Sequence, residues 1–177
     1  SILQVPGARD VAVEFYSVSK TYCMAGWRIG WVVGNGELVR ALNALKENID
    51  SGPFNAVQNA AAWGLDHHER ITPPVRARFA ARADRFCSGL EKAGWRFRRP
   101  GGSCFVWARP PADMSSLDSV CLMLEKAAVL AAPGSGFGRC GEGYVRFSLT
   151  EPEPLLYEAL RRIRKLRWPG KEPRSKR

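Results

Sequence analysis

Apolar residues recur along this chain at two spacings, which predict an alternation of helices and strands. Leu38, Leu42, Leu45 and Ile49 follow one another at intervals of four, three and four, the spacing of one helix face. Short apolar runs such as 11–15 have the length and composition of strands. The pattern predicts helices over Glu37–Asp50, Asn55–His68, 75–94, Leu117–Ala128 and Leu155–Leu166. It predicts strands over Val11–Phe15, Arg28–Val33, Trp95–Arg98, Cys104–Ala108, Val129–Ala131 and Tyr144–Leu149.

Turn-forming residues separate these segments. Gly34-Asn35-Gly36 closes the second strand, and Asn55 is expected to cap the helix that follows it. Pro73-Pro74 is expected to mark the boundary before the longest helix, because proline removes a helical hydrogen bond. These breaks divide the chain near residue 73.

The order of elements predicts an α/β fold made of unequal parts. The part before Pro73 has only two or three strand candidates, too few for a complete doubly wound domain. The part after it alternates helices and strands and is typical of a compact, complete α/β layer. We expect a remnant of a large mixed-sheet domain, a small α/β domain and a basic, disordered tail, over residues 1–72, 73–168 and 169–177.

Composition indicates a globular chain, with 45% hydrophobic and 25% charged residues, and the net charge of +10 permits two interpretations. A basic chain can bind nucleic acid. However, much of the excess is arginine on the predicted outer faces of helices, and the tail adds more. We therefore favour a solvated basic face and expect no nucleic-acid partner. The helix arginines are Arg76, Arg78, Arg82, Arg85, Arg161, Arg162, Arg164 and Arg167.

Several features limit the setting of the chain. No apolar run approaches the roughly 20 residues that cross a bilayer, and residues 1–7 are no signal peptide, so we expect a cytoplasmic protein without membrane contact. These first residues lack a methionine and resemble the interior of a larger protein. The cysteines have no zinc-ligand spacing, so we expect no metal site and small buried or half-buried side chains. They are Cys23, Cys87, Cys104, Cys121 and Cys140.

One lysine has surroundings that favour chemistry. Lys20 follows an apolar strand and lies near Tyr16, Tyr22 and Trp27 in the sequence. These aromatic neighbours would desolvate its amine and favour the neutral, nucleophilic form. Such a lysine can form an imine with an aldehyde.

A phosphate grip surrounds this lysine. Ser17 and Ser19 offer hydroxyl groups, and Arg28 offers a planar fork that can bind two phosphate oxygens at once. Gly26 and Gly30 permit close approach of the backbone near the arginine. The combination suits a phosphate-bearing aldehyde that is held covalently.

The spacing Ser-x-x-Lys followed by Gly-x-Arg-x-Gly resembles the pyridoxal-phosphate lysine signature of fold-type I class I/II aminotransferases. Later segments resemble the small-domain hairpin of that family, its Pro-Gly-x-x-Phe-Gly turn and the strand whose arginine binds the substrate α-carboxylate. These segments are 100–107, 132–138 and 143–148. Residues 2–7 and 24–28 look closest to the bacterial alanine aminotransferase branch, which lies near the LL-diaminopimelate aminotransferases.

The resemblance implies a role for each matched residue. Lys20 would form a Schiff base with pyridoxal 5'-phosphate and later move the α-proton of the substrate, while Ser17 and Arg28 would bind the cofactor phosphate. Arg146 would bind the substrate carboxylate; the alternative for Arg146 is a structural salt bridge. The family also implies a homodimer, because its active sites form between two subunits.

The resemblance further implies a truncated aminotransferase fold, with residues 1–72 as the end of the cofactor-binding domain. The aspartate that pairs with the pyridine nitrogen, and other cofactor contacts, lie N-terminal to the matched part in the family. We therefore expect the chain alone to be inactive. Cys23 stands where related proteins often have asparagine, which leaves the substrate preference open.

The expected activity is transfer of an amino group between an α-amino acid, alanine above all, and a 2-oxo acid such as 2-oxoglutarate. One alternative is a pyridoxal-phosphate β-lyase, which would keep Lys20 and Arg28 but release ammonia. A diaminopimelate aminotransferase and a non-catalytic basic interaction module are the others.

Overall fold

The computed structural model describes residues 1–169, so the tail expected to be disordered lies, from residue 170 on, outside the described residues. The chain divides into two compact units. The N-terminal unit comprises Ser1–Arg76, and the C-terminal unit begins at Ala77. Helix α5 (His68–Ala93) contributes to both units.

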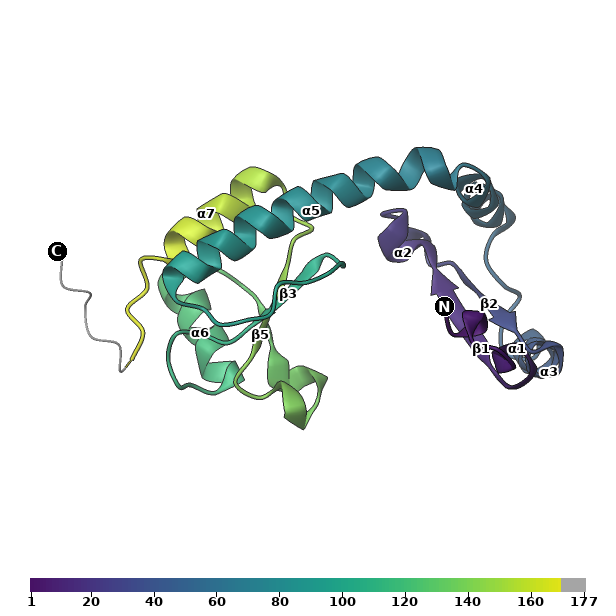
Figure 1. The fold of residues 1–177 in the computed structure, drawn as a ribbon, viewed down its shortest axis with the longest axis horizontal. Coiled ribbons are helices and arrows are strands. Elements are labelled where there is room, and N and C mark those ends of the chain that lie inside the picture. Colours follow the sequence, from purple (N-terminus) through teal and green to yellow (C-terminus); the bar gives the residue numbers. More distant parts are fainter. Residues whose placement is uncertain (170–177) are drawn as a thin grey trace. The chain divides into compact units, whose positions relative to one another are not determined.

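The N-terminal unit is built on a two-stranded antiparallel hairpin (Figure 1). Its side-chain caps fix where the flanking helices begin: Asn35 Oδ1 accepts 2.9 Å hydrogen bonds from the backbone N–H groups of Glu37 and Leu38. The hairpin strands are β1 (Val13–Ser17) and β2 (Gly30–Gly34). The short helical segments are η1 (Ile2–Gln4), α1 (Ala8–Val11), α2 (Val18–Thr21) and η2 (Ala25–Trp27). The longer helices are α3 (Gly36–Glu47) and α4 (Asn55–Asp66).

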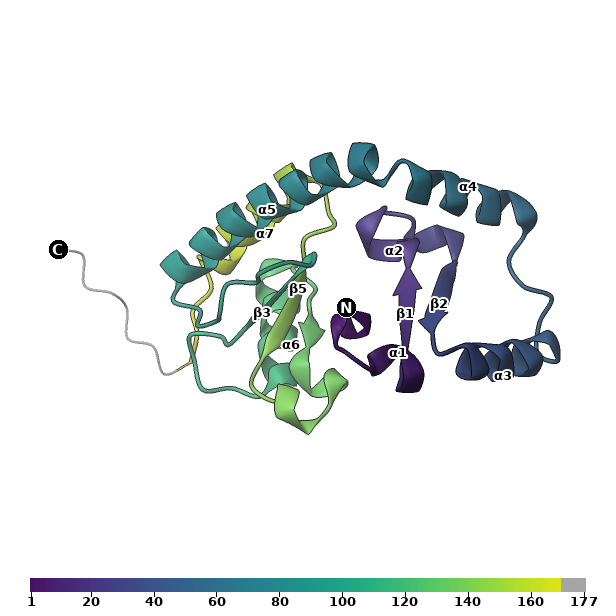
Figure 2. The ribbon, with the colours of Figure 1, turned by 45° about the vertical axis from the view of Figure 1, so that its right-hand side comes forward.

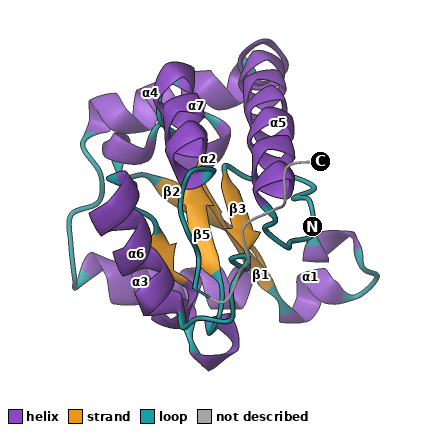
Figure 3. Cartoon of the chain, turned by 90° about the vertical axis from the view of Figure 1, so that its left-hand side faces the viewer, coloured by secondary structure: helices purple, strands orange, loops and turns teal. Residues whose placement is uncertain are grey.

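The C-terminal unit is a three-stranded antiparallel sheet in the order β3-β5-β4, with helices packed on one face. Strands β3 and β5 lie side by side in Figure 3, and α5 and α7 lie along each other in Figure 2. The strands are β3 (Phe105–Ala108), β4 (Ala132–Pro133) and β5 (Val145–Ser148). The helical segments are α6 (Ser116–Ala127), η3 (Gly134–Phe137), η4 (Arg139–Gly141) and α7 (Glu153–Ile163).

The core of this unit follows the alternation of side chains along the strands. The side chains of Val106 on β3 and of Val145 and Phe147 on β5 face the helices. All three are fully or almost fully buried. Met123 on α6 and Leu160 on α7 close the same cluster. The other face of the sheet is thereby left for Phe105, Trp107 and Arg146, the half-buried members of the alternation.

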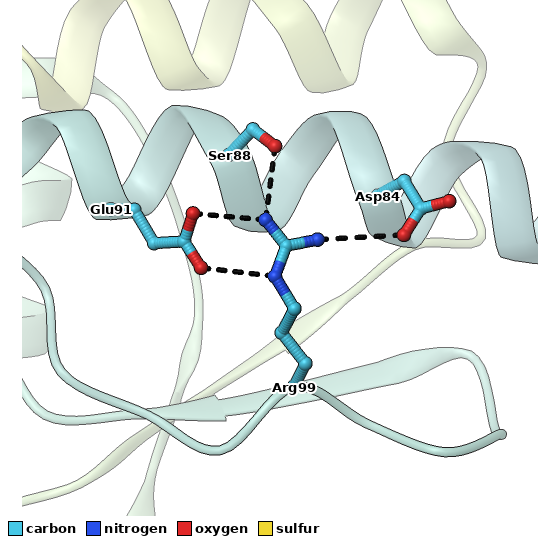
Figure 4. A network of polar contacts seen from close by, with 4 residues as sticks. All are labelled: Asp84, Ser88, Glu91 and Arg99. Carbon is cyan, nitrogen blue, oxygen red and sulfur yellow. Dashed lines mark hydrogen bonds and ion pairs between the residues drawn. The ribbon is translucent and has the colours of Figure 1, made fainter.

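A branched ionic contact fastens the segment after α5 to that helix (Figure 4). The Arg99 guanidinium donates to both Glu91 carboxylate oxygens, at 3.0 and 2.9 Å, and to Ser88 Oγ at 3.1 Å. Asp84 Oδ1 lies 3.4 Å from the same group. The hydrogen bonds from Arg99 hold the pKa of Glu91 below its ordinary value.

The predicted helices are largely confirmed, but the expected cap of α4 and two expected strands are wrong. The cap of α4 is Phe54, so Asn55 is its first helical residue. The strand expected over Trp95–Arg98 is reduced to one bridge between Arg96 and Arg109. The strand expected over Val129–Ala131 is displaced, because pairing with β5 begins only at Ala132.

The prolines at 73 and 74 do not begin a new helix. They lie inside α5, which starts at His68 and continues to Ala93. Both fall within the first two turns, and their side chains are exposed, so the rings point away from packed neighbours. The two compact units nevertheless separate two residues further on, between Arg76 and Ala77.

The cysteines are free and divide by burial. Cys87 and Cys104 are buried, as expected, and burial raises the pKa of the Cys87 thiol. Cys23, Cys121 and Cys140 are exposed, so the expectation of burial is wrong for these three. Residues 1–169 include no helix with the length and apolar character to cross a membrane.

Candidate functional site

The register of the hairpin brings together the two ends of the connection between β1 and β2, residues 18–29, which we call the lysine loop. Ser17, the last residue of β1, pairs with Gly30, the first residue of β2. A side chain at Gly30 would overlap the carbonyl oxygen of Tyr16, so this close approach of the strands requires glycine. The twelve residues between the strands therefore form a closed loop that contains Lys20 and Arg28.

Ser17 starts the helical turn that carries the lysine. Its Oγ accepts a 3.1 Å hydrogen bond from the backbone N–H of Ser19 and donates to Ser19 Oγ at 2.9 Å, which caps α2. Val18 packs inward and is 1% exposed, whereas Lys20 is exposed. The expected desolvation of the Lys20 amine by its aromatic neighbours stays a prediction.

The same loop contains two strained residues. Cys23 and Arg28 both have left-handed backbone conformations, with φ of 55° and 52°, although neither is glycine. Arg28 Nη1 donates a 2.8 Å hydrogen bond to the carbonyl oxygen of Ala25, which ties the side chain to its own turn. Strain of this kind persists where the surrounding structure over-determines it, and it concentrates at ligand-binding sites.

A contact between two side chains, which the sequence did not indicate, anchors the lysine loop to α5. The hydroxyl of Tyr22 lies 2.8 Å from Nδ1 of His68, and Nε2 of His68 lies 3.4 Å from Oγ1 of the buried Thr72. Tyr22 closes α2 two residues after Lys20. Because 46 residues separate Tyr22 from His68, no local pattern in the sequence could have indicated this pair.

Arg146 lies on β5, on the face of the sheet that the helices leave open. Its guanidinium carbon is 4.3 Å from the ring centroid of Phe105 and 4.2 Å from that of Phe137. No acidic side chain among residues 1–169 forms an ion pair with it, so the alternative of a salt bridge finds no partner there. Two aromatic faces thus hold a planar donor that suits a carboxylate.

The predicted site residues fall into two groups. Ser17, Lys20 and Arg28 share one loop of the N-terminal unit, whereas Arg146 belongs to the C-terminal unit. In the described residues, His, Cys, Asp and Glu side chains form no group of three or more that could hold a metal ion. The N-terminal loop offers hydroxyl, amine and guanidinium groups, the donors that a phosphorylated aldehyde requires.

Comparison with known proteins identifies the family. The model of the family described as aminotransferase class I and II matches residues 4–163. The chain belongs to the class I and II aminotransferases. It is 47% identical over 166 residues to the LL-diaminopimelate aminotransferase of Nitratidesulfovibrio vulgaris and 45% identical over 167 residues to that of Aquifex aeolicus. Each match covers 94% of the chain and 43% of the relative, so the chain spans less than half the length of these relatives.

Solved aminotransferases share the fold. An aminotransferase from Staphylococcus aureus superposes with a TM-score of 0.87 at 36% identity, over 93% of the chain and 44% of that structure. The predicted fold class is confirmed to this extent: the chain is a mixed α/β part of the fold type I aminotransferase architecture.

Proposed function

We propose that the aminotransferase to which this chain belongs holds pyridoxal 5'-phosphate at the loop between β1 and β2, as its family does. The observation that supports this is the loop itself, which places Ser17 beside the start of β2 and carries Lys20 and Arg28 between the strands. Ser17 Oγ and the Arg28 fork would bind the phosphate, and Lys20 Nζ would bond to the aldehyde carbon. The bound cofactor supplies an electron sink for cleavage at the α-carbon of an amino acid.

Each residue then has a defined task. With the cofactor bound, the Lys20 amine would be the group that accepts the α-proton of the substrate and donates a proton back, and so would act as both base and acid of the transfer. The Arg146 fork binds and orients the α-carboxylate between the Phe105 and Phe137 rings. Tyr22 and His68 keep the turn of Lys20 in place.

The amino donor is best assigned as LL-diaminopimelate, with 2-oxoglutarate as the 2-oxo acid. The relatives at 45–47% identity carry the name LL-diaminopimelate aminotransferase, which supports this alternative over alanine. A transamination assay of the whole protein with both amino donors in competition tests the assignment. Preferential consumption of L-alanine would restore the first expectation. The proposal includes a cytoplasmic homodimer, and sedimentation of the whole protein tests its dimeric state.

Borohydride reduction tests the cofactor site directly. The 177-residue chain is incubated with pyridoxal phosphate, reduced, digested and mapped by mass spectrometry. We expect label on the peptide that contains Lys20, loss of that label in Lys20→Ala and weaker labelling in Arg28→Gln. Lys46, which is also exposed and lies on α3 outside the loop, serves as the reference lysine. Equal labelling of Lys46 and Lys20 would contradict the proposal.

A further inference from the structure

A second group of arginines lies in the C-terminal unit, and the proposed transamination does not use it. Arg96 and Arg109 are paired directly across an antiparallel bridge, joined by backbone hydrogen bonds of 3.0 and 2.8 Å. Opposed residues in such a pair send their side chains to the same face. Two like charges opposite each other weaken the pairing, so the arrangement departs from what stability alone favours.

The structure does not neutralise these charges. Neither Arg96 nor Arg109, nor the nearby Arg98, forms an ion pair with any acidic residue of 1–169. Arg99, the next residue, shows the contrast, because Glu91 and its neighbours on α5 surround its guanidinium (Figure 4). Arg99 therefore has a structural role, while Arg96, Arg98 and Arg109 carry charges that no acidic side chain of residues 1–169 compensates by an ion pair.

The three arginines are exposed and line an open cavity of about 410 Å³ together with Phe97, Trp107 and Tyr144. No carboxylate is among these lining residues. The rings are held in place: Trp107 stacks on Tyr144 with centroids 5.7 Å apart and planes 27° apart, and the Arg109 guanidinium carbon lies 4.5 Å from the Tyr144 centroid. The volume is within the usual range of small-molecule sites, and the lining combines fixed aromatic faces with cationic forks.

We propose that this cavity binds an organic anion that carries both phosphate groups and a planar ring, of which a nucleoside diphosphate is the simplest example. Three guanidinium groups match the several charged oxygens of a diphosphate. A single carboxylate would neutralise only one of the three guanidinium groups. Trp107 and Tyr144 supply surfaces on which the ring can stack. Arg146 does not line the cavity, but Trp107 pairs with Arg146 across β3 and β5 and contacts the Phe137 ring, so the cavity adjoins the proposed carboxylate contact.

Calorimetric titration of the 177-residue chain tests the site, with ADP, pyrophosphate and adenosine as probes. We expect saturable binding of one ADP, with pyrophosphate at least about tenfold weaker because the stacking contribution is lost. Adenosine, which lacks the charge, should show no saturation. Trp107→Leu should weaken ADP binding and leave pyrophosphate binding unchanged.

Substitutions locate the site. Arg96→Gln and Arg109→Gln should each raise the Kd for ADP about tenfold or more, and Arg109→Lys should give an intermediate value because it keeps the charge but loses the fork. Arg78→Gln removes the same charge from an exposed position on α5 and should change the Kd less than about twofold at physiological salt. Unchanged far-UV circular dichroism shows that each variant is folded.

Several results would overturn the inference. Equal weakening by Arg78→Gln would mean attraction to the net charge alone, and equal affinity for pyrophosphate and ADP would remove the ring from the ligand. Loss of binding in Arg28→Gln but not in Arg109→Gln would place ADP at the phosphate grip of the N-terminal loop. Tighter binding of a single-stranded RNA oligonucleotide, abolished by the same Gln substitutions, would make nucleic acid the ligand instead.

Discussion

Gly30 is the residue on which the geometry of the lysine loop depends most directly. A Cβ at this position would overlap the Tyr16 carbonyl oxygen across the hairpin. We expect Gly30→Ala to destabilise the chain by about 1–3 kcal/mol, because two backbone segments must move apart. Urea denaturation followed by tryptophan fluorescence measures the change. Gly26→Ala, in the same loop with nothing within 4 Å of the added atom, is the control; equal destabilisation by both substitutions would contradict this explanation.

At the residue scale the sequence supports only the local part of the site. Ser17, Lys20 and Arg28 could be grouped by spacing alone, because they share one loop of the hairpin. The exposure of Lys20 could not be inferred, since it depends on packing that spacing does not describe. Likewise the opposition of Arg96 and Arg109 depends on the register of a single bridge, which the sequence does not specify.

Helix α5 is the element whose sequence most opposes its structure. Pro73 and Pro74 lack the N–H groups that would complete the hydrogen bonds of this part of the helix. We expect the double substitution Pro73→Ala/Pro74→Ala to raise the free energy of unfolding by about 2 kcal/mol. The restored helical hydrogen bonds stabilise the folded state, and the greater conformational entropy of the unfolded chain offsets part of this gain. Far-UV circular dichroism in urea gives the value. Pro154→Ala, in the first turn of α7 where proline is tolerated, should change it by less than about 0.5 kcal/mol; a less stable double variant would show that the prolines favour the native helix.

The remaining errors at this scale have a common cause. Helical periodicity over ten or more residues identifies α3, α6 and α7 without knowledge of their partners. The short segments around 95–98 and 129–131 have no such period. Whether they form strands depends on pairing with a strand that is distant in the sequence. Only Arg96 finds a partner in the first segment, and β4 extends over just two residues after the second.

Helix α7 has a built-in dependence on pH. Hydrogen bonds from Arg161, and then from Arg162, lower the pKa of Glu158 to about 2. Because the pKa is lower in the folded state, the ion pairs contribute fully above the ordinary glutamate pKa and lose their contribution as the pH falls toward about 2. Glu158→Gln should therefore be less stable than the parent at pH 7, with a difference that shrinks below about pH 4.5.

Urea denaturation of both proteins between pH 3 and 7 measures this difference. Glu125→Gln is the matched control, because Glu125 is exposed on α6 and forms no ion pair with another residue of 1–169. A change with pH as large as that of Glu158→Gln would mean that the loss of a carboxylate, and not of the ion pairs, causes the effect. A constant difference for Glu158→Gln would show that its ion pairs contribute nothing to stability.

At the scale of the whole molecule, the two units differ in how much apolar surface they bury. The hydrophobic cluster around Phe86, Met123 and Phe147 lies wholly in the C-terminal unit. In the N-terminal unit the buried apolar residues are Ala8, Val18 and Ala61. Large side chains there are exposed, Phe15 by 73% and Phe54 by 76% among them. Since burial of apolar surface is the main source of stability, the units should differ in their resistance to unfolding.

Hydrogen exchange of the 177-residue chain, read by mass spectrometry, tests this difference. We expect amides of β3, β5 and α6 to exchange at least about a hundredfold more slowly than those of β1 and β2. Met123→Ala, which removes a fully buried side chain at a cost of about 2–5 kcal/mol, should accelerate exchange in the first group and leave the second unchanged. If exchange in β1 and β2 accelerated equally, the two units would unfold as one cooperative structure, because the loss of one core would then be felt throughout the chain.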